Sequence, residues 1–294
     1  MLHFIKLNCC GVLSLKLKFT KMHGCGNDYI FFDCFAQPAP KHPEELSVRL
    51  SDRNFGVGGD GIVLILPPER SENDAQMRIF NADGSEASMC GNATRCIGKY
   101  LFEHGYVKGE AVRLETGSGV KILTLFFDNS GKVKSVRVNM GKASLNPADL
   151  PALVGGERAV KRMLPFTCGE REATLVSVGN PHCVIFDSPE LVTALGPAIE
   201  RDPIFPNRVN VEFAEVIGEN RLRMRVWERG SGETLACGTG ACATAVAAAE
   251  CGLCDDSKPI TVVLRGGELV IEYTPDAVFM TGPAEIAFEG EVEV

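Results

Sequence analysis

Short apolar runs of the kind found in β-strands dominate both halves of the chain. They predict strands at residues 62–66, 76–80, 111–115, 120–127 and 133–138, and again at 173–178, 183–186, 209–216, 222–227, 260–264 and 268–273. Asn129-Ser130-Gly131 and Gly266-Gly267 each predict a hairpin turn between two of these runs. Neighbouring strands are therefore expected to pair mainly in the antiparallel sense.

Each half also contains one segment with the composition of a buried helix. Residues 92–104 are rich in large apolar side chains, and residues 239–250 are almost entirely Ala, Cys, Thr and Val. A helix that is apolar or small nearly all round is buried, and Gly105 and Gly252 are suited to end the two helices. Strands wrapped around one central helix, twice over, are the expected architecture.

The segment that precedes each of these helices is repeated. Residues 77–91 and 224–238 share Met, Arg, Glu, Cys and Gly at a fixed offset of 147 (237 − 90), which is half of the 294 residues. The chain therefore reads as two copies of one unit, each with a cysteine at the same place, Cys90 and Cys237.

The repeat predicts an α+β fold of two pseudo-symmetric domains, each a mostly antiparallel, barrel-like sheet around its buried helix. We expect an N-terminal extension at 1–16, a first domain at 17–145 that is joined by the C-terminal strand 280–294, and a second domain at 146–279. Residues 146–156, with two prolines and a Gly-Gly pair, suit a linker. Shorter helices are expected to begin at Pro43 and at Ser188-Pro189.

Composition narrows the functional class. The net charge of −8 disfavours nucleic acid and anionic membranes as general partners, and 45% hydrophobic with 23% charged residues is ordinary for a soluble globular protein. Twelve cysteines without the spacing of a secreted disulfide framework indicate reduced thiols and a cytoplasmic protein.

Cys90 and Cys237 each directly precede a helix. Free backbone N–H groups and the positive end of the helix dipole lower a thiol pKa from about 8.5 toward neutrality and also attract a carboxylate. Two such thiols on opposite sides of an α-carbon can invert it, one removing the hydrogen and the other supplying a proton. The alternative to an enzyme is a redox or zinc module, although Cys251 and Cys254 form the only C-x-x-C spacing.

Six ordered motifs give the chain a specific resemblance to the diaminopimelate epimerases, a cofactor-free enzyme family of lysine and cell-wall precursor synthesis. The similarity runs from residue 18 to about residue 283. It rests on residues 23–28 (HGCGND), 80–86 (FNADGSE), 90–96 (CGNATRC), 179–183 (GNPHC), 208–210 (RVN) and 228–240 (ERG running to ACGTG).

The resemblance implies a role for each matching residue. Cys90 and Cys237 resemble the proton-transfer pair, and His182 and Glu228 resemble the groups that tune them. The resemblance further implies a homodimer that acts on a small molecule with no cofactor and no metal. The residues that resemble substrate-binding groups are, at the reacting carboxylate, Gly91, Asn92, Gly238 and Thr239, and, at the two amino-acid ends, Asn27, Asn81, Asn180, Asn210, Glu228 and Arg229.

Two departures from the family pattern qualify this reading. Gly61 stands where many members carry a glutamine, and residues 1–16 have no family counterpart, so we expect the native chain to start at position 17 or to carry 1–16 as a loose tail. The nearest alternative enzyme is a proline or hydroxyproline racemase, which the family resembles in fold. Glu228-Arg229 and the several asparagines favour a diamino dicarboxylic acid over a small ring.

Overall fold

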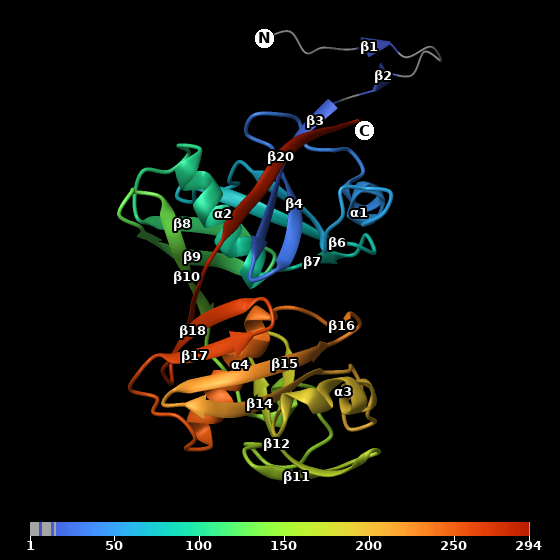
Figure 1. Ribbon diagram of the computed structural model, residues 1–294, viewed down its shortest axis with the longest axis vertical. Coiled ribbons are helices and arrows are strands. Elements are labelled where there is room, and N and C mark those ends of the chain that lie inside the picture. The colour runs from blue at the N-terminus through green and yellow to red at the C-terminus, as the bar shows by residue number, and fades with distance from the viewer. Residues whose placement is uncertain (1–5, 8–12, 15, 294) are drawn as a thin grey trace. The chain divides into compact units, whose positions relative to one another are not determined.

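The computed structural model describes residues 6–7, 13–14 and 16–293. By their contacts these residues form two compact units (Figure 1). The first unit holds the chain up to residue 24, residues 28–125 and the chain from 284 onward, and the second holds residues 25–27 and 126–283. The domain limits expected from the sequence stay predictions, and the expected linker 146–156 contains a short 3-10 helix, η1 (Pro147–Asp149).

From residue 16 onward, ten elements of regular structure make up the first unit. Strand β9 ends two residues beyond the unit's limit at Leu125. The elements are β3 (Lys16–Gly24), β4 (Asn27–Asp33), α1 (Pro43–Ser51), β5 (Gly61–Leu66), β6 (Ala75–Asn81), β7 (Glu86–Ala87), α2 (Gly91–Glu103), β8 (Ala111–Thr116), β9 (Gly119–Phe127) and β20 (Glu285–Glu293).

The second unit repeats this succession of strands and helices. A 3-10 turn, η2, runs directly into α3, where the sequence predicted one helix start. Its elements after η1 and β10 (Val133–Gly141) are β11 (Arg162–Phe166), β12 (Gly169–Ser177), β13 (Pro181–Phe186), η2 (Pro189–Leu191), α3 (Val192–Glu200), β14 (Asn210–Gly218), β15 (Arg221–Glu228), β16 (Gly232–Glu233), α4 (Gly238–Glu250), β17 (Ile260–Leu264), β18 (Gly267–Tyr273) and β19 (Val278–Gly282).

Strand pairing follows one scheme in both units. In the first, β4 and β5 are parallel, β5 and β6 antiparallel, β6 and β8 parallel, and β8 and β9 antiparallel. In the second, β13–β14, β14–β15, β15–β17 and β17–β18 repeat that order of directions. Each parallel pair is joined by a segment that contains a helix, the crossover that parallel strands require. The repeat read from the sequence is thus a repeat of topology.

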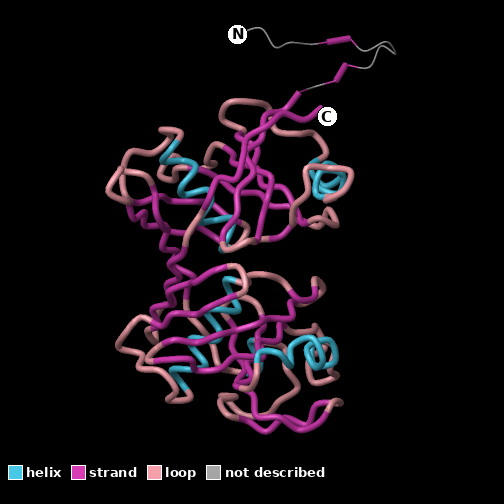
Figure 2. Tube along the Cα trace, viewed as in Figure 1, coloured by secondary structure: helices cyan, strands magenta, loops and turns pink. Residues whose placement is uncertain are grey.

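Each central helix lies among strands, as predicted (Figure 2). Every residue of α2 from Gly91 to Leu101 is buried, and α4 is packed against β12, β13, β14, β15, β17, β18 and β19. Both helices end in a left-handed glycine, Gly105 at φ +77° and Gly252 at φ +70°, as the sequence predicted.

The sheet of the second unit curves around α4 without closing. Hydrogen-bonded neighbours run in the order β10, β19, β18, β17, β15, β14, β13, β12. Among the described residues no strand pairing joins β10 to β12, and an isolated bridge links Ser177 at the end of β12 to Ser144, three residues beyond the end of β10. The fold is therefore the predicted mixed, mainly antiparallel arrangement around a helix, with an open seam.

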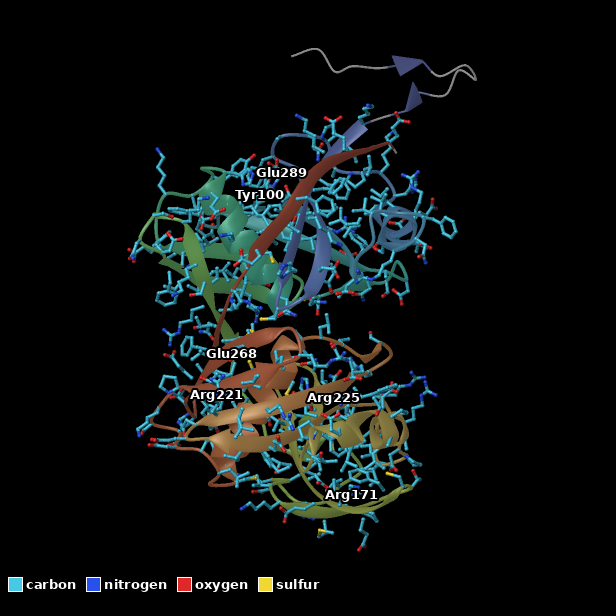
Figure 3. The ribbon with its side chains drawn as sticks, viewed as in Figure 1. Tyr100, Arg171, Arg221, Arg225, Glu268 and Glu289 are labelled. Atoms are coloured by element: carbon cyan, nitrogen blue, oxygen red, sulfur yellow. The ribbon has the colours of Figure 1, made fainter. Side chains whose placement is uncertain are left out.

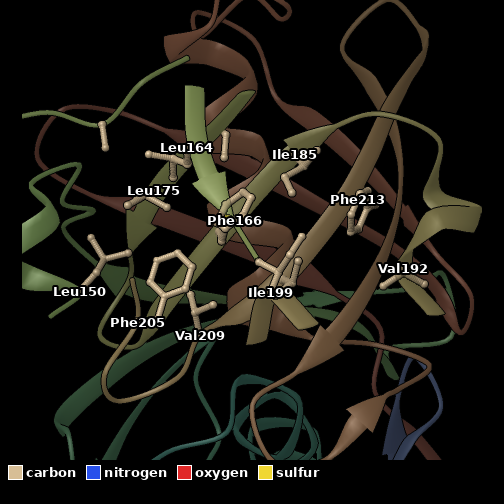
Figure 4. Packing of buried hydrophobic residues seen from close by; sticks show 14 residues of the cluster. Leu150, Leu164, Phe166, Leu175, Ile185, Val192, Ile199, Phe205, Val209 and Phe213 are labelled. Carbon is tan, nitrogen blue, oxygen red and sulfur yellow. The ribbon is translucent and has the colours of Figure 1, made fainter. Parts of the chain in front are cut away.

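A separate hydrophobic cluster lies on the other side of this sheet, under α3 (Figure 4). Phe166, Phe205 and Phe213 pack there with aliphatic side chains of β11 to β14. In the first unit a comparable cluster under α1 joins Leu17 to Phe32 and Phe80. Each layer of sheet thus has apolar side chains on both faces, which explains the near-continuous apolar runs of β5 and β13.

Ion pairs join neighbouring strands of the sheets. Arg221 of β15 and Glu268 of β18 lie against each other (Figure 3), and the less exposed Arg225 contacts Glu233 at 2.7 Å. An exposed pair such as Arg221–Glu268 contributes roughly 0–1 kcal/mol. The buried helices and clusters therefore carry most of the stability.

The expected N-terminal tail is only partly described. Lys16 and Leu17 already belong to β3, where Leu17 is fully buried and pairs with Val292. Lys6–Leu7 and Leu13–Ser14 form a two-stranded antiparallel pair. The rest of the segment 1–16 lies outside the described residues, so the loose-tail hypothesis stays a prediction.

Gly61 cannot carry a side chain in this fold. A Cβ at this position would lie 2.1 Å from the carbonyl oxygen of Phe80 on the paired strand β6. A glutamine here would force β5 and β6 apart, so the departure from the family pattern is a local backbone requirement.

We expect Gly61→Ala to lower the free energy of unfolding by about 2 kcal/mol or more, because overpacking against backbone is costly. The measurement is a denaturant titration beside Gly109→Ala, whose Cβ meets nothing within 4 Å. Equal denaturation midpoints for the two variants would show that β6 can move away from β5 at little cost in free energy.

Candidate active site

Cys237 occupies the N-cap of α4, immediately after the hairpin of β15 and β16. Its side chain is 6% exposed. The backbone N–H of Gly240 donates to its sulfur at 3.3 Å, and the Thr239 hydroxyl lies 3.5 Å from the same atom. The helix end thus directs two donors at the thiol, as expected from the position of the cysteine in the sequence.

The net effect on the thiol is the reverse of the one predicted. Burial raises the pKa of Cys237 well above its usual value, and the negative charges of Glu228 and Glu212 act in the same direction. The hydrogen bonds from Thr239 and Gly240 lower the pKa but do not compensate. Desolvation outweighs the helix end because the sulfur is enclosed, so the expected shift toward neutrality is wrong for Cys237.

Glu228 is the last residue of β15 and lies beside this thiol. Burial raises the pKa of its carboxyl, while hydrogen bonds from Thr234 and Cys237 lower it. The Thr234 hydroxyl donates to Oε1 of Glu228. A thiol that donates to a carboxyl of raised pKa forms a pair through which one proton can move with little change in charge.

His182, at the start of β13, is fully buried with Glu212 of β14. Nδ1 of His182 lies 2.7 Å from Oε1 of Glu212, and neither side chain is exposed. Nε2 of His182 lies 3.0 Å from Oδ1 of Asn180, and Nδ2 of Asn180 donates to the Thr239 hydroxyl at 3.2 Å. His182 therefore connects to the environment of Cys237 through two polar side chains.

Asn210 has its amide committed to the backbone. Its Nδ2 donates to the Pro181 carbonyl at 2.9 Å, and its Oδ1 accepts from the Arg229 backbone N–H at 2.9 Å. Asn210 therefore fixes the loop after β15 relative to the start of β13. The guanidinium of Arg229 is exposed on that loop, with a hydrogen bond to the Asn207 carbonyl at 3.4 Å.

The first unit presents the equivalent helix end. Cys90 is the half-buried N-cap of α2, and Gly91 and Asn92 open the helix. The fully buried guanidinium of Arg95 donates to Oδ1 of Asn92 at 2.9 Å and to the Gly91 carbonyl at 3.3 Å. A buried cation thus adds positive charge to the first turn of α2.

Asn81 and Asn27 stand at strand ends. Asn81 ends β6, the place that Glu228 takes in β15, and its Nδ2 donates to the Ser85 hydroxyl at 3.0 Å. Asn27 begins β4 and is assigned by contacts to the second unit.

Hydrogen bonds join Asn180, His182 and Glu228 to the N-terminal end of α4, whereas the predicted residues are otherwise placed only by the unit to which they belong. Asn81, Cys90, Gly91 and Asn92 belong to the first unit. The second unit holds Asn27, Asn180, His182, Asn210, Glu228, Arg229, Cys237, Gly238 and Thr239.

The sequence analysis missed three polar residues of these helix ends: Glu212, Thr234 and Arg95. Glu212 interrupts the apolar strand 209–214, and Arg95 lies inside a helix expected to be buried, so each stood out as a charge in an apolar context. Thr234 had no such signal. None of the ten described cysteines is in a disulfide.

Comparison with known proteins agrees with the motifs. The family model described as diaminopimelate epimerase matches residues 19–146 and 174–287. A diaminopimelate epimerase of Acetivibrio thermocellus is 48% identical over 285 residues, which covers 95% of this chain and 99% of the relative. One of Methanococcus maripaludis is 43% identical over 285 residues and is covered completely.

Solved structures share the fold at low identity. A hydroxyproline epimerase from Agrobacterium vitis has a TM-score of 0.67 at 17% identity, with 95% of this chain and 93% of that chain covered. A PhzF-family phenazine biosynthesis protein of Bacillus anthracis has a TM-score of 0.67 at 14% identity, with 95% and 99% covered. Together with the family model and the relatives, the two-unit fold shows that the chain belongs to the diaminopimelate epimerase family of isomerases.

Proposed function

We propose that the protein interconverts LL- and meso-2,6-diaminopimelate by proton transfer between two cysteines, without a cofactor, in lysine and peptidoglycan precursor synthesis. One observation carries the proposal: each unit of the repeat sets a cysteine at the N-cap of its buried central helix, Cys90 before α2 and Cys237 before α4. Relatives at 43–48% identity carry the name of this activity.

Inversion at a carbon needs a base on one face and an acid on the other. In the proposed reaction one cysteine, as thiolate, removes the α-hydrogen and becomes a thiol, while the other thiol protonates the carbanion and becomes a thiolate. Cys237, whose pKa is raised by burial, suits the acid in the direction where Cys90 is the base. The reverse direction exchanges the two roles.

The helix ends supply the charge that the reaction needs. In the proposed reaction the N-terminal N–H groups of α2 and α4, at Gly91-Asn92 and Gly238-Thr239, stabilise the reacting carboxylate as electron density builds on it. The exposed guanidinium of Arg229 suits the distant carboxylate. Asparagines 27, 81 and 180 offer amide oxygens for the ammonium groups, with Glu228 as a negative partner, whereas Asn210 acts through the Arg229 loop.

His182 and Glu228 are proposed to tune the thiols. Glu228 does so directly, because its carboxyl accepts a hydrogen bond from Cys237 and raises the pKa of that thiol through its charge.

A proline or hydroxyproline racemase activity has the shared fold as its support, at 17–18% identity to solved structures. The non-enzymatic redox or zinc module is disfavoured by membership in an isomerase family.

The proposal includes a cytoplasmic homodimer. The support for the compartment is the use of cysteine, since twelve cysteines lack the spacing of a secreted disulfide framework, and the homodimer is taken from the resemblance to the family. No helix among the described residues is long and apolar enough to span a membrane.

Replacing either cysteine should abolish epimerisation. We expect Cys90→Ala and Cys237→Ala each to lower kcat/KM by at least about 100-fold, since a positioned acid or base contributes that much. Serine should fail as well, because its hydroxyl is far less acidic than a thiol. Deuterium uptake from heavy water into diaminopimelate measures the reaction.

The control is Cys254→Ala, a half-buried cysteine beyond α4 that has no proposed role. Near-normal epimerisation by Cys237→Ala would disprove the two-cysteine mechanism. Racemisation of proline, with no exchange into diaminopimelate, would assign the protein to the alternative enzyme.

Thr234 should set the acid limb of the pH–rate profile. Its hydrogen bond lowers the pKa of Glu228, so Thr234→Val should raise that pKa and move the acid limb of kcat/KM to higher pH. A hydrogen bond to a charged group is worth about 1.5 kcal/mol, which corresponds to a shift of roughly one pH unit.

Thr234→Ser keeps the donor and should retain the wild-type limb. Superimposable profiles for the valine and serine variants would show that ionisation of Glu228 does not govern the acid limb.

A further inference from the structure

Glu212 is a fully buried carboxyl with one dedicated partner. Its Oε1 contacts Nδ1 of His182 at 2.7 Å, and no described residue forms a hydrogen bond with its Oε2. Burying a carboxyl costs several kcal/mol unless its contacts compensate. The charge of Glu212 by itself raises the pKa of Cys237, whereas its one hydrogen bond is made to the imidazole of His182.

The contacts beyond His182 form a continuous chain to the sulfur of Cys237. Nε2 of His182 lies 3.0 Å from Oδ1 of Asn180, and Nδ2 of Asn180 lies 3.2 Å from the hydroxyl oxygen of Thr239. That oxygen lies 3.5 Å from the sulfur. All links belong to the second unit.

The donors in this chain all point toward Cys237. Oδ1 of Asn180 can only accept, so Nε2 of His182 carries a hydrogen, and the Asn180 amide then donates to Thr239. The thiol hydrogen of Cys237 goes to Glu228. The sulfur is therefore left as an acceptor for the Thr239 hydroxyl, as it is for the Gly240 N–H.

That direction depends on the protons that the His182–Glu212 pair holds. With a hydrogen on Nε2, the contact at Nδ1 needs either an imidazolium beside a carboxylate or a carboxylic acid that donates to Nδ1, and the pair is neutral in both cases. A hydrogen-bond chain with aligned donors is strengthened cooperatively in a buried site. If the hydrogen moved from Nε2 to Nδ1 of His182, the Asn180 amide would have to turn over to donate to Nε2. The Thr239 hydroxyl would then donate to Asn180 and no longer to the sulfur of Cys237.

We infer that Glu212 is a positioning residue: through His182, Asn180 and Thr239 it orients a hydroxyl donor at the sulfur of Cys237 and so stabilises the thiolate of that residue. This inference rests on the proposed function for the role of the thiolate. Asn180 and Thr239 then have two roles, substrate contact and orientation of the donor at Cys237. The buried Glu212 then has an indirect role in proton transfer.

The test is the pH dependence of Cys237 modification in the full-length protein. Methyl methanethiosulfonate is the probe because it is small and reacts with thiolates, and peptide mass spectrometry resolves Cys237 from the other cysteines. We expect Thr239→Val to move the midpoint at Cys237 to higher pH by about half a unit or more, because the thiolate loses a donor. Thr239→Ser should retain the wild-type midpoint.

Glu212→Gln distinguishes a positioning residue from a nearby charge. Glutamine can donate or accept at Nδ1 of His182, so it no longer sets the direction of the hydrogen bonds that lead to Cys237. The midpoint of Cys237 modification should therefore again move to higher pH. A charge effect alone has the opposite sign, because removing a negative charge near a buried thiol lowers the thiol pKa. A lowered or unchanged midpoint in Glu212→Gln therefore overturns the inference.

The double variant tests transmission. If the chain carries the effect, Glu212→Gln should add nothing in the Thr239→Val background, because the last link is already missing. The same shift in both backgrounds would show a route that bypasses Thr239 and would overturn the inference.

Two controls protect the result against a fold defect. Asp202→Asn removes another buried carboxyl of this unit, whose partners are Thr167 and the Ile204 backbone, and should leave the midpoint unchanged. If Glu212→Gln does not fold, Asn180→Leu removes the middle link at a half-exposed site and should match Thr239→Val. An unshifted Asn180→Leu also overturns the inference. The measurement needs no substrate, so a protein that fails to epimerise diaminopimelate refutes the proposed function without affecting it.

Discussion

The enclosure of α4 by strands on every side is the constraint from which the rest of the second unit follows. Only a helix of small residues lets seven strands approach it, and the strands must curve to do so. The N-terminal end of α4, at Gly238, is the end at which Cys237 lies. The residues that flank it, from β13, β14 and β15, are brought together by this packing and not by proximity in sequence.

The same burial that positions Cys237 also makes it harder for this cysteine to become a thiolate. A thiol at the end of a buried helix gains donors from the backbone but loses water, and for Cys237 the loss dominates. Reactivity therefore depends on the side chains that replace the water. Glu228 accepts a hydrogen bond from the thiol of Cys237, and the Thr239 hydroxyl lies next to the sulfur. These few polar groups therefore determine the charge state of Cys237 in a largely apolar environment.

Local sequence was sufficient for the periodic elements and insufficient for what depends on distant partners. The two central helices lie within one residue of their predicted bounds at both ends because their composition and glycine stops are local signals. The parallel pairs, such as β6 with β8, join strands that the sequence cannot match. The pKa direction at Cys237 was missed for the same reason, since its desolvation comes from strands far along the chain. Glu212 was visible only as a charge in an apolar run until β13 brought His182 to it.

The pairing of β20 with β3 has a consequence for how the chain is made. Residues 285–293 are the partners of residues 16–23, so the sheet of the first unit cannot be completed before residues 285–293 have been made. The second unit, almost wholly contiguous in residues 126–283, is available earlier. During synthesis β3 exposes an unpaired edge while the later unit acquires its core, and exposed edges favour aggregation. Strand β3 therefore has to wait for a partner that lies more than 260 residues further along the chain (285 − 23).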